Sequence, residues 1–200
     1  MDKRNELKPI LARTSQVIFF ILILINCIMN PSYNSFYLFV SFCLILISNW
    51  VIKHLFVKQL YNYFDKTSLP ILGIGHRPNK ASGCFFVNDG IIANDYGMPS
   101  CHSQIAWAIA TYIICKIIKQ KYKQYNNNNK IVTVFDYSWS LLSCIIVLVV
   151  ALYISYSRVY IEGCHTIQQV SVGGILGIVS GFIIYYFEDN IINLKYIIFN

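Results

Sequence analysis

The sequence predicts an all-α, polytopic membrane protein, a helical bundle with about five transmembrane helices. Of its 200 residues, 56% are hydrophobic and only 12% are charged, whereas soluble domains carry about 25% charged residues. The apolar residues are gathered in long runs, separated by polar or Gly- and Pro-containing segments. The formal net charge of +7 is spread over the termini and loops. Basic residues in such places orient a membrane protein, so we do not infer nucleic-acid binding.

Each apolar run is expected to form one helix across a hydrocarbon core of about 30 Å. The first run follows a basic segment, as a signal peptide would, but no small-residue cleavage site follows it, so we expect an uncleaved helix. The last run carries glycines four residues apart, which lets a neighbouring helix approach closely. The five runs are 17–29, 36–55, 103–118, 137–155 and 166–187.

One membrane domain, residues 15–187, is expected between a polar segment (1–14) and a short amphipathic tail (188–200). Five crossings place the loop 56–99 and the turn 156–165 on one face and the loop 120–136 on the other. The loop 120–136 is basic and Asn-rich, which favours the cytoplasm and places the opposite face in the lumen. The N-terminus is also basic and lies on the same face as the loop 56–99, which would instead favour the cytoplasm for that face.

On the face that carries the loop 56–99 and the turn 156–165, two arginines and a predicted helix N-terminus indicate a phosphate-binding site. Arg77 and Arg158 are the arginines away from the N-terminus, and a guanidinium is a planar donor suited to phosphate oxygens. Pro99 and Ser100 before an apolar run predict a helix N-terminus, whose amides and dipole attract an anion. The structural alternatives are an N-cap role for Ser100 and membrane-interface anchoring for each arginine.

Histidines supply the chemistry that such a site needs. His76, His102 and His165, three of the four histidines, lie in these segments. One imidazole can attack phosphorus, while another protonates the leaving oxygen and then activates water. Cations would stabilise the charge on the phosphoryl oxygens. Neither an Asp/Glu cluster suited to Mg²⁺ nor a Cys/His metal spacing is present, so we expect no metal and no cofactor.

The seven cysteines fall into two groups. Four lie within apolar runs, where cysteine acts as a small hydrophobic residue: Cys27, Cys43, Cys115 and Cys144. Cys84, Cys101 and Cys164 lie in or near the loops of the candidate site. Two of these three would form a disulfide if that face is oxidising, and the sequence does not decide which.

These motifs resemble the type-2 phosphatidic acid phosphatase (PAP2) superfamily. Its pattern is Lys, six residues, Arg-Pro; then Pro-Ser-x-His; then Ser-Arg, five residues, His, three residues, Asp. The stretches NWVIK (49–53), YGMPSCHSQ (96–104), YSRVY (156–160) and HTIQQV (165–170) are similar to its dolichyldiphosphatase branch, which has Gln in place of that Asp. The resemblance covers about residues 36–187.

The resemblance implies a PAP2-like helical core and the hydrolysis of dolichyl diphosphate to dolichyl phosphate and phosphate. The partners are then this polyprenyl diphosphate lipid and the membrane lipids, and the place is the lumenal face of the endoplasmic reticulum membrane. The reaction recycles the carrier lipid for protein N-glycosylation. The resemblance makes His165 the nucleophile, His102 the acid and base, and Gln169 the residue that orients His165; the phosphate-binding residues would be Lys53, Arg77, Ser100 and Arg158.

Two spacings depart from the family pattern. Lys53 and Arg77 are separated by 23 residues rather than six, which indicates an insert within 54–76 and makes Lys58 and Lys66 competing candidates. Six residues rather than five separate Arg158 from His165, and Gly163 can absorb the extra one as a bulge.

Two other functions remain as alternatives to the hydrolysis of dolichyl diphosphate. One is the same chemistry on phosphatidate or another prenyl diphosphate, and the other is an inactive relative that binds lipid phosphates. The oligomeric state is not set by the sequence.

Overall fold

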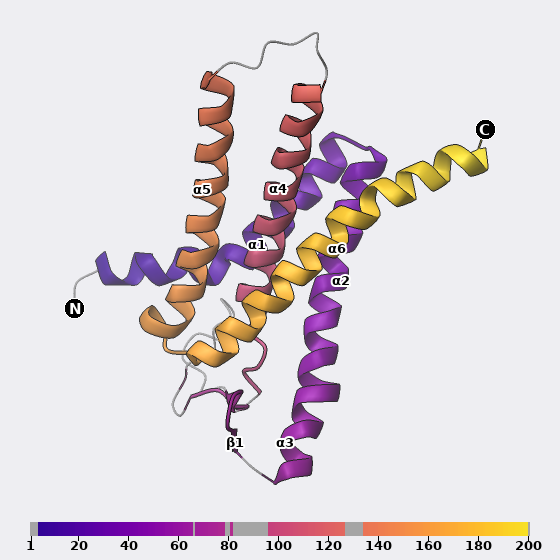
Figure 1. Cartoon of the computed structure of the whole chain (residues 1–200). Helices are drawn as coiled ribbons and strands as arrows, with labels where there is room; N and C mark the ends of the chain where they lie inside the picture. Colours follow the sequence, from indigo (N-terminus) through magenta and orange to yellow (C-terminus); the bar gives the residue numbers. More distant parts are fainter. Residues whose placement is uncertain (1–3, 66, 79–80, 82–95, 127–133, 200) are drawn as a thin grey trace.

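The structure, a computed structural model, is a bundle of α-helices, which confirms the predicted fold class (Figure 1). It describes residues 4–65, 67–78, 81, 96–126 and 134–199. In chain order the elements are α1 (Arg4–Met29), α2 (Tyr33–Val51), η1 (Ile52–Val57), α3 (Lys58–Phe64), β1 (Ser68–Leu69), β2 (Gly73–Ile74), α4 (Cys101–Asn126), α5 (Val134–Tyr156), η3 (Ser157–Ile161) and α6 (Ile167–Phe199).

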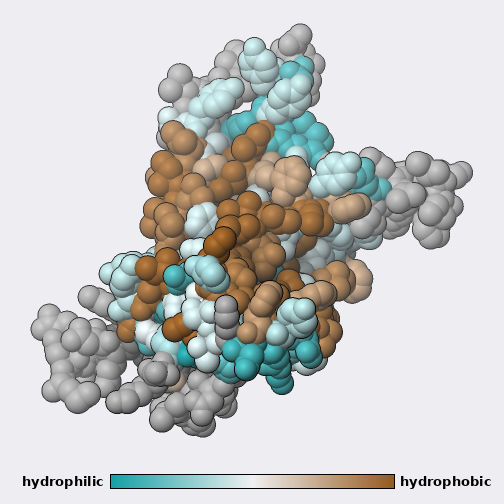
Figure 2. All heavy atoms as spheres, turned by 60° about the horizontal axis from the view of Figure 1, so that its bottom comes forward, coloured by the Kyte–Doolittle hydropathy of each residue, from teal (hydrophilic) through white to brown (hydrophobic). Residues whose placement is uncertain are grey.

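The helices match the predicted apolar runs. Within the described ranges, four helical segments are long and apolar enough to cross a membrane, and a fifth apolar helix, Thr14–Met29, is shorter. The four are Tyr33–Phe64, Cys101–Asn126, Tyr137–Ile161 and Ile167–Glu188. Figure 2 shows a hydrophobic belt between two hydrophilic ends. α6 continues without a break beyond the fifth apolar run to Phe199, so it includes most of the predicted tail 188–200.

The centre of the bundle is the contact between α4 and α6, and glycine allows it. A side chain at Gly173 would collide with the backbone carbonyl of Ser100, directly before α4. Side chains at Gly177 and Gly181 would collide with the α4 carbonyls of Gln104 and Ala108. The two backbones are therefore in direct contact, as the four-residue spacing predicts. Small buried residues of α4 continue this packing toward α5, where Ala106 and Ala110 meet Ala151 and Ile154.

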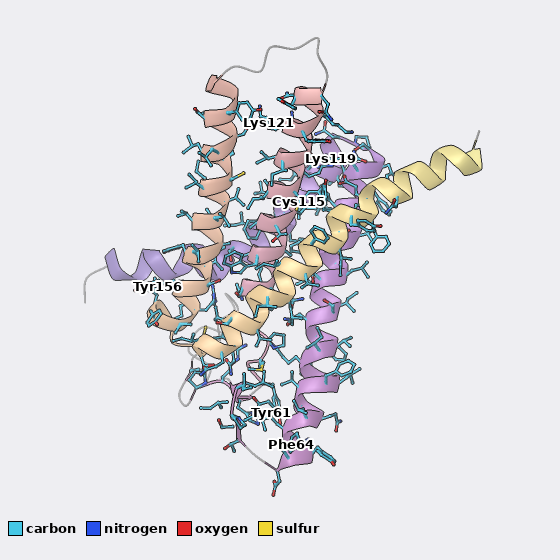
Figure 3. All side chains as sticks on the ribbon, in the orientation of Figure 1. Tyr61, Phe64, Cys115, Lys119, Lys121 and Tyr156 are labelled. Atoms are coloured by element: carbon cyan, nitrogen blue, oxygen red, sulfur yellow. The ribbon has the colours of Figure 1, made fainter. Side chains whose placement is uncertain are left out.

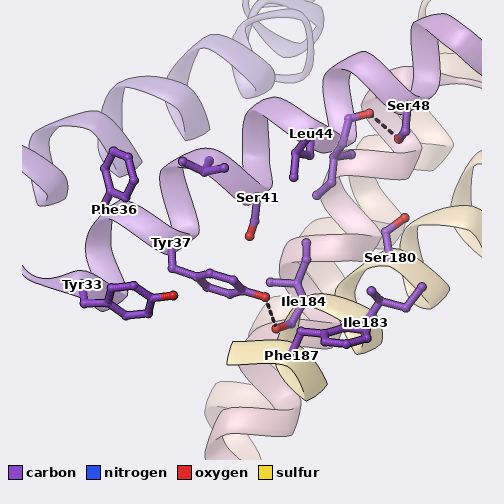
Figure 4. Close-up of a pocket in the computed structure, with 12 residues that line it drawn as sticks. Tyr33, Phe36, Tyr37, Ser41, Leu44, Ser48, Ser180, Ile183, Ile184 and Phe187 are labelled. Atoms are coloured by element: carbon purple, nitrogen blue, oxygen red, sulfur yellow. Dashed lines mark hydrogen bonds between the residues drawn. The ribbon is translucent and has the colours of Figure 1, made fainter. Parts of the chain in front are cut away.

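A groove separates α2 from α6 on another side of the bundle (Figure 4). Its volume is about 500 Å³, and its walls are mostly apolar, including Phe36, Leu44, Ile183 and Phe187. The hydroxyl of Tyr37 donates a hydrogen bond of 2.8 Å to the carbonyl of Ile184, which joins the two helices at this groove (Figure 4).

Two helices change to π-helical geometry near the same end of the bundle. α2 continues into η1, which carries Lys53, and α5 continues into η3, which carries Arg158. A π-helical turn accommodates an extra residue and occurs frequently at functional sites. After η1 the chain forms α3, turns at Asp65 with a φ of 47°, and returns through the antiparallel hairpin β1–β2. The predicted insert 54–76 therefore consists of most of η1, α3 and this hairpin.

The segments that carry the motifs meet at the lower end of the bundle in Figure 1, below α4 and beside the start of α6. His76 pairs with Tyr96 in an isolated β-bridge. The Ser100 backbone N–H donates to the Gln169 carbonyl at 3.1 Å. The far ends of α4 and α5 lie at the opposite end of the bundle (Figure 1).

Replacing Gly177 by alanine tests the backbone contact between α4 and α6. The new methyl group would collide with the Gln104 carbonyl. We expect stability in detergent to fall by about 1–3 kcal/mol, as in other overpacked cores, despite the gain of up to about 1 kcal/mol in helix propensity. Gly174→Ala is the matched control, because the nearest neighbours of its methyl would be side chains, Trp107 at 3.1 Å and the Ser103 hydroxyl at 3.6 Å, rather than backbone. Equal thermal unfolding midpoints for the two variants would contradict this packing.

Candidate active site

The candidate site gathers buried polar side chains at the lower end of the bundle, where η1, η3 and the starts of α4 and α6 meet. Each of these side chains belongs to a residue that is at most 9% exposed: Lys53, Ser100, His102, Arg158, His165 and Gln169. Burying charged and polar groups costs free energy unless they are paired or serve a ligand. The concentration of such groups in one place therefore points to a binding or catalytic role.

The side chains of His165 and Gln169 form the best-defined pair of the site. His165 Nδ1 lies 3.0 Å from Gln169 Oε1. Gln169 Nε2 donates to two backbone carbonyls, Ile74 at 2.8 Å and His76 at 2.7 Å. Only the amide nitrogen can donate, so these carbonyls fix the amide orientation and turn its oxygen toward the imidazole. Nδ1 must then carry the ring proton, and Nε2 presents a lone pair.

The first turn of α6 holds Gln169 in this position. The Gln169 backbone N–H donates to Thr166 Oγ1, and the Thr166 backbone N–H donates to Gln169 Oε1, both at 3.3 Å. This reciprocal pattern is a capping box, for which the sequence signal is Thr-x-x-Gln. The same amide oxygen thus caps the helix and orients His165. Sequence reasoning missed this second role, although the signal was present.

The extra residue between Arg158 and His165 is absorbed locally. η3 is π-helical, and Gly163 adopts a φ of +60°, which favours glycine. The backbone N–H groups of Cys164 and His165 then both donate to the Arg158 carbonyl, at 3.1 and 3.2 Å. The longer turn therefore still brings His165 back against the helix that carries Arg158.

Three cations lie close enough to His165 to change its protonation. Burial lowers the pKa of the His165 imidazole well below its usual value, and the charge of Arg77 lowers it further. The bond to Gln169 opposes this, while Lys53 and Arg158 again lower the pKa. The structure thus brings Lys53 to the site, whereas Lys58 is exposed and Lys66 lies outside the described residues.

Arg158 is held by a carboxylate that sequence reasoning did not include in the site. Its Nη1 donates to Glu162 Oε2 at 3.1 Å, and the Ser157 hydroxyl donates to Glu162 Oε1 at 3.2 Å. The Arg158 and Glu162 side chains are 0% and 1% exposed. A buried ion pair of this kind fixes the direction of the guanidinium. The sequence signal for this ion pair was the four-residue spacing of Arg158 and Glu162, which places opposite charges side by side on a helix.

Ser100 and His102 come from the start of α4. The Ser100 carbonyl accepts the first helical bond, from Gln104 N–H at 3.0 Å, so Ser100 occupies the N-cap position. Its hydroxyl is buried and, among the described residues, has no hydrogen-bond partner. The side chain therefore does not cap α4 and remains available to a ligand. His102 is buried in the following turn, and a helix N-terminus favours an anion.

The cysteines near the site differ in their bonding state. Cys101 is free, as are the four cysteines of the apolar runs. Cys164, directly before His165, is disulfide-bonded, and Cys84 lies outside the described residues. In the part of the chain that the structure describes, His, Cys, Asp and Glu side chains form no group of three or more that could hold a metal ion.

Comparison with known proteins identifies the family. The profile of the PAP2 superfamily matches residues 36–192, a range that includes every predicted site residue. The chain belongs to the PAP2 superfamily. Within that superfamily it is similar to Dolichyldiphosphatase 1 of Homo sapiens, at 36% identity over 86 residues, or 43% of this chain and 34% of the relative. The proteins of that name from Callithrix jacchus and Mus musculus are 35% and 34% identical over the same shares.

The match covers only part of these PAP2 relatives. The chain spans about a third of the length of the curated relatives it matches, since 34% of each is covered. No solved structure matches the chain. The family of this chain therefore rests on the PAP2 profile, which matches most of its length.

The lowered pKa of His165 has a consequence for stability. In the unfolded chain the imidazole takes up a proton below about pH 6.5, whereas in the folded protein it stays neutral to a lower pH. Stability should therefore fall as the pH drops below about 6.5, because the unfolded state binds more protons. His165→Asn should weaken this dependence. Unfolding midpoints of both proteins between pH 7.5 and 5 test it, and identical slopes would contradict it.

Proposed function

We propose that this protein is a membrane phosphatase that hydrolyses dolichyl diphosphate to dolichyl phosphate and phosphate through a phosphohistidine at His165. The observation that carries the proposal is a buried imidazole, hydrogen-bonded through Nδ1 to Gln169, on which the charges of Arg77, Lys53 and Arg158 act. A neutral imidazole is the nucleophilic form, and cations stabilise the phosphoryl oxygens during attack. The similarity to proteins named Dolichyldiphosphatase 1 supports the choice of substrate.

The first step would transfer the terminal phosphoryl group to the protein. Arg77, Arg158 and Lys53, with the Ser100 hydroxyl, would bind its oxygens. His165 Nε2 attacks phosphorus, the bond from phosphorus to the bridging oxygen breaks, and dolichyl phosphate leaves. His102 donates a proton to the departing oxygen as general acid.

The second step would release phosphate. His102, now unprotonated, accepts a proton from water as the water oxygen attacks phosphorus. The bond between phosphorus and Nε2 breaks, inorganic phosphate leaves, and His165 returns to its neutral form. Gln169 keeps the proton on Nδ1 in both steps, and its oxygen stabilises the positive charge of the phosphorylated ring. These steps use side chains of the chain alone.

We place the active site at the lumenal face of the endoplasmic reticulum membrane, where the reaction would recycle the carrier lipid for protein N-glycosylation. The catalytic domain would be residues 15–187, and membrane lipids would surround its apolar helices. The apolar, multi-helix character of the chain supports the membrane location.

Phosphate release by the purified protein in detergent tests the proposal. We expect chelator-resistant release from dolichyl diphosphate, faster than from phosphatidate or a shorter prenyl diphosphate. Faster release from phosphatidate would favour the broader lipid phosphatase activity of the superfamily. Absence of release from every lipid phosphate would contradict a catalytic role.

Substitution of His165 tests the nucleophile. His165→Ala removes the attacking nitrogen, so we expect the rate of phosphate release to fall by roughly 10³-fold or more, as for other nucleophiles. The measurement is single-turnover release under saturating substrate, with thermal unfolding to establish that the variant is folded. Full activity in this variant would exclude the proposed mechanism.

Substitution of Lys53 tests which lysine serves the first motif. Loss of a charge-assisted bond of about 1.5–3 kcal/mol corresponds to roughly a 10- to 100-fold loss of kcat/KM. We expect this loss for Lys53→Ala, because Lys53 is 9% exposed and lies near His165. Lys58→Ala is the matched control, since Lys58 is exposed on the neighbouring helix. Equal kcat/KM values for the two variants would contradict the assignment of Lys53.

A further inference from the structure

We propose that Tyr61, within the segment 54–76 that departs from the family spacing, is a positioning residue for His165. It would act through the hairpin strand that holds the Gln169 amide, and so would fix the tautomer of the imidazole. This inference rests on the proposed function for its effect on catalysis, but its structural part can be measured without any substrate.

Tyr61 contacts the hairpin directly. Tyr61 lies on α3, is 2% exposed, and faces the hairpin (Figure 3). Its hydroxyl donates to the Gly73 carbonyl at 2.8 Å. A side chain at Gly75 would come within 2.9 Å of the Tyr61 ring, so the ring packs directly on that residue. Tyr61 thus holds both residues that flank Ile74.

The carbonyls of residues 73–76 accept hydrogen bonds alternately from two groups of donors. Gly73 has a φ of 71°, so this segment is not a regular strand, and the alternation is seen in the hydrogen bonds of its carbonyls. The Gly73 and Gly75 carbonyls accept from Tyr61 and from the Gly97 backbone N–H, at 2.8 and 2.9 Å. The Ile74 and His76 carbonyls both accept from Gln169 Nε2. The contacts to the Gly73 and Gly75 carbonyls therefore set the position of the Ile74 and His76 carbonyls, which hold the Gln169 amide.

The orientation of His165 depends on the Ile74 and His76 carbonyls. A carboxylate orienting a histidine needs no such support, because both its oxygens accept hydrogen bonds. A carboxamide has one accepting and one donating end, and either could face the ring. The two carbonyls bind the donating end, which leaves the oxygen for Nδ1 at 3.0 Å. Moving the strand away would leave only the longer bond from the Thr166 N–H, at 3.3 Å, to fix the amide orientation. It would thereby allow the tautomer with the proton on Nε2, which cannot attack phosphorus.

Tyr61→Phe tests this chain of contacts by removing only the hydroxyl. We expect kcat for dolichyl diphosphate to fall about tenfold, in line with the loss of one buried hydrogen bond, with KM changed less than twofold. In protein with isotope-labelled histidine, the His165 signal in NMR spectra, assigned with His165→Asn, should move from the Nδ1–H tautomer toward a mixture. A merely structural role for Tyr61 would not change the tautomer.

Tyr37→Phe is the matched control. It removes a hydrogen bond of the same kind and length, 2.8 Å from a tyrosine hydroxyl to a carbonyl, in the groove between α2 and α6 (Figure 4). We expect a comparable loss of thermal stability, with kcat and the His165 tautomer as in the wild type. A similar fall in kcat for both variants, or an unchanged tautomer in folded Tyr61→Phe, would overturn the proposal.

Gly75→Ala provides an independent variant that retains the hydroxyl. Its methyl group would push the strand from the Tyr61 ring, so we expect the same changes in kcat and tautomer. If Tyr61→Phe does not fold, Gly75→Ala tests whether the hairpin sets the His165 tautomer. An unchanged tautomer in folded Gly75→Ala then overturns the proposal. If the wild type releases no phosphate, the proposed function fails, yet the tautomer measurement still tests the role of Tyr61.

Discussion

The hydrogen bond between His165 Nδ1 and Gln169 Oε1 is the interaction on which the rest of the site depends. It determines which ring nitrogen carries the proton and therefore which one faces a ligand. Its direction is set by the two carbonyls that bind the other end of the amide. Its position is set by the first turn of α6, where the same oxygen closes a capping box. The Gln169 side chain thus bonds the first turn of α6, the Ile74 and His76 carbonyls and the His165 imidazole at the same time.

Charge is the second constraint, because Lys53, Arg77 and Arg158 all act on one largely buried imidazole. Gathering like charges away from water costs free energy, and Glu162 offsets only part of it at Arg158. Burial and these cations lower the pKa of the His165 imidazole, which favours the neutral form that a nucleophile requires. A phosphate group would reduce the repulsion, so binding an anion and stabilising the site favour each other. The two π-helical turns that carry Lys53 and Arg158 position this charge.

Hydropathy predicted the bundle because membrane spans need long apolar runs, and it placed the segments with His102 and His165 at one end. The spacing of Gly173, Gly177 and Gly181 likewise predicted close packing of the last helix. The sequence could not choose between Lys53, Lys58 and Lys66, because the path of residues 54–76 depends on the Tyr61 contact with the hairpin. Glu162 and the cap at Thr166 were missed because their signals are short and common.

The proposed mechanism requires that His165 Nε2 becomes phosphorylated during turnover. The most direct measurement is a rapid quench with dolichyl diphosphate carrying a labelled terminal phosphate, followed by alkaline digestion and mapping of the label. We expect a phosphoprotein that is stable to alkali and labile to acid, with the label on the peptide that contains His165, and no label in His165→Ala. Label on the peptide of His102, or turnover without any labelled protein, would contradict the claim.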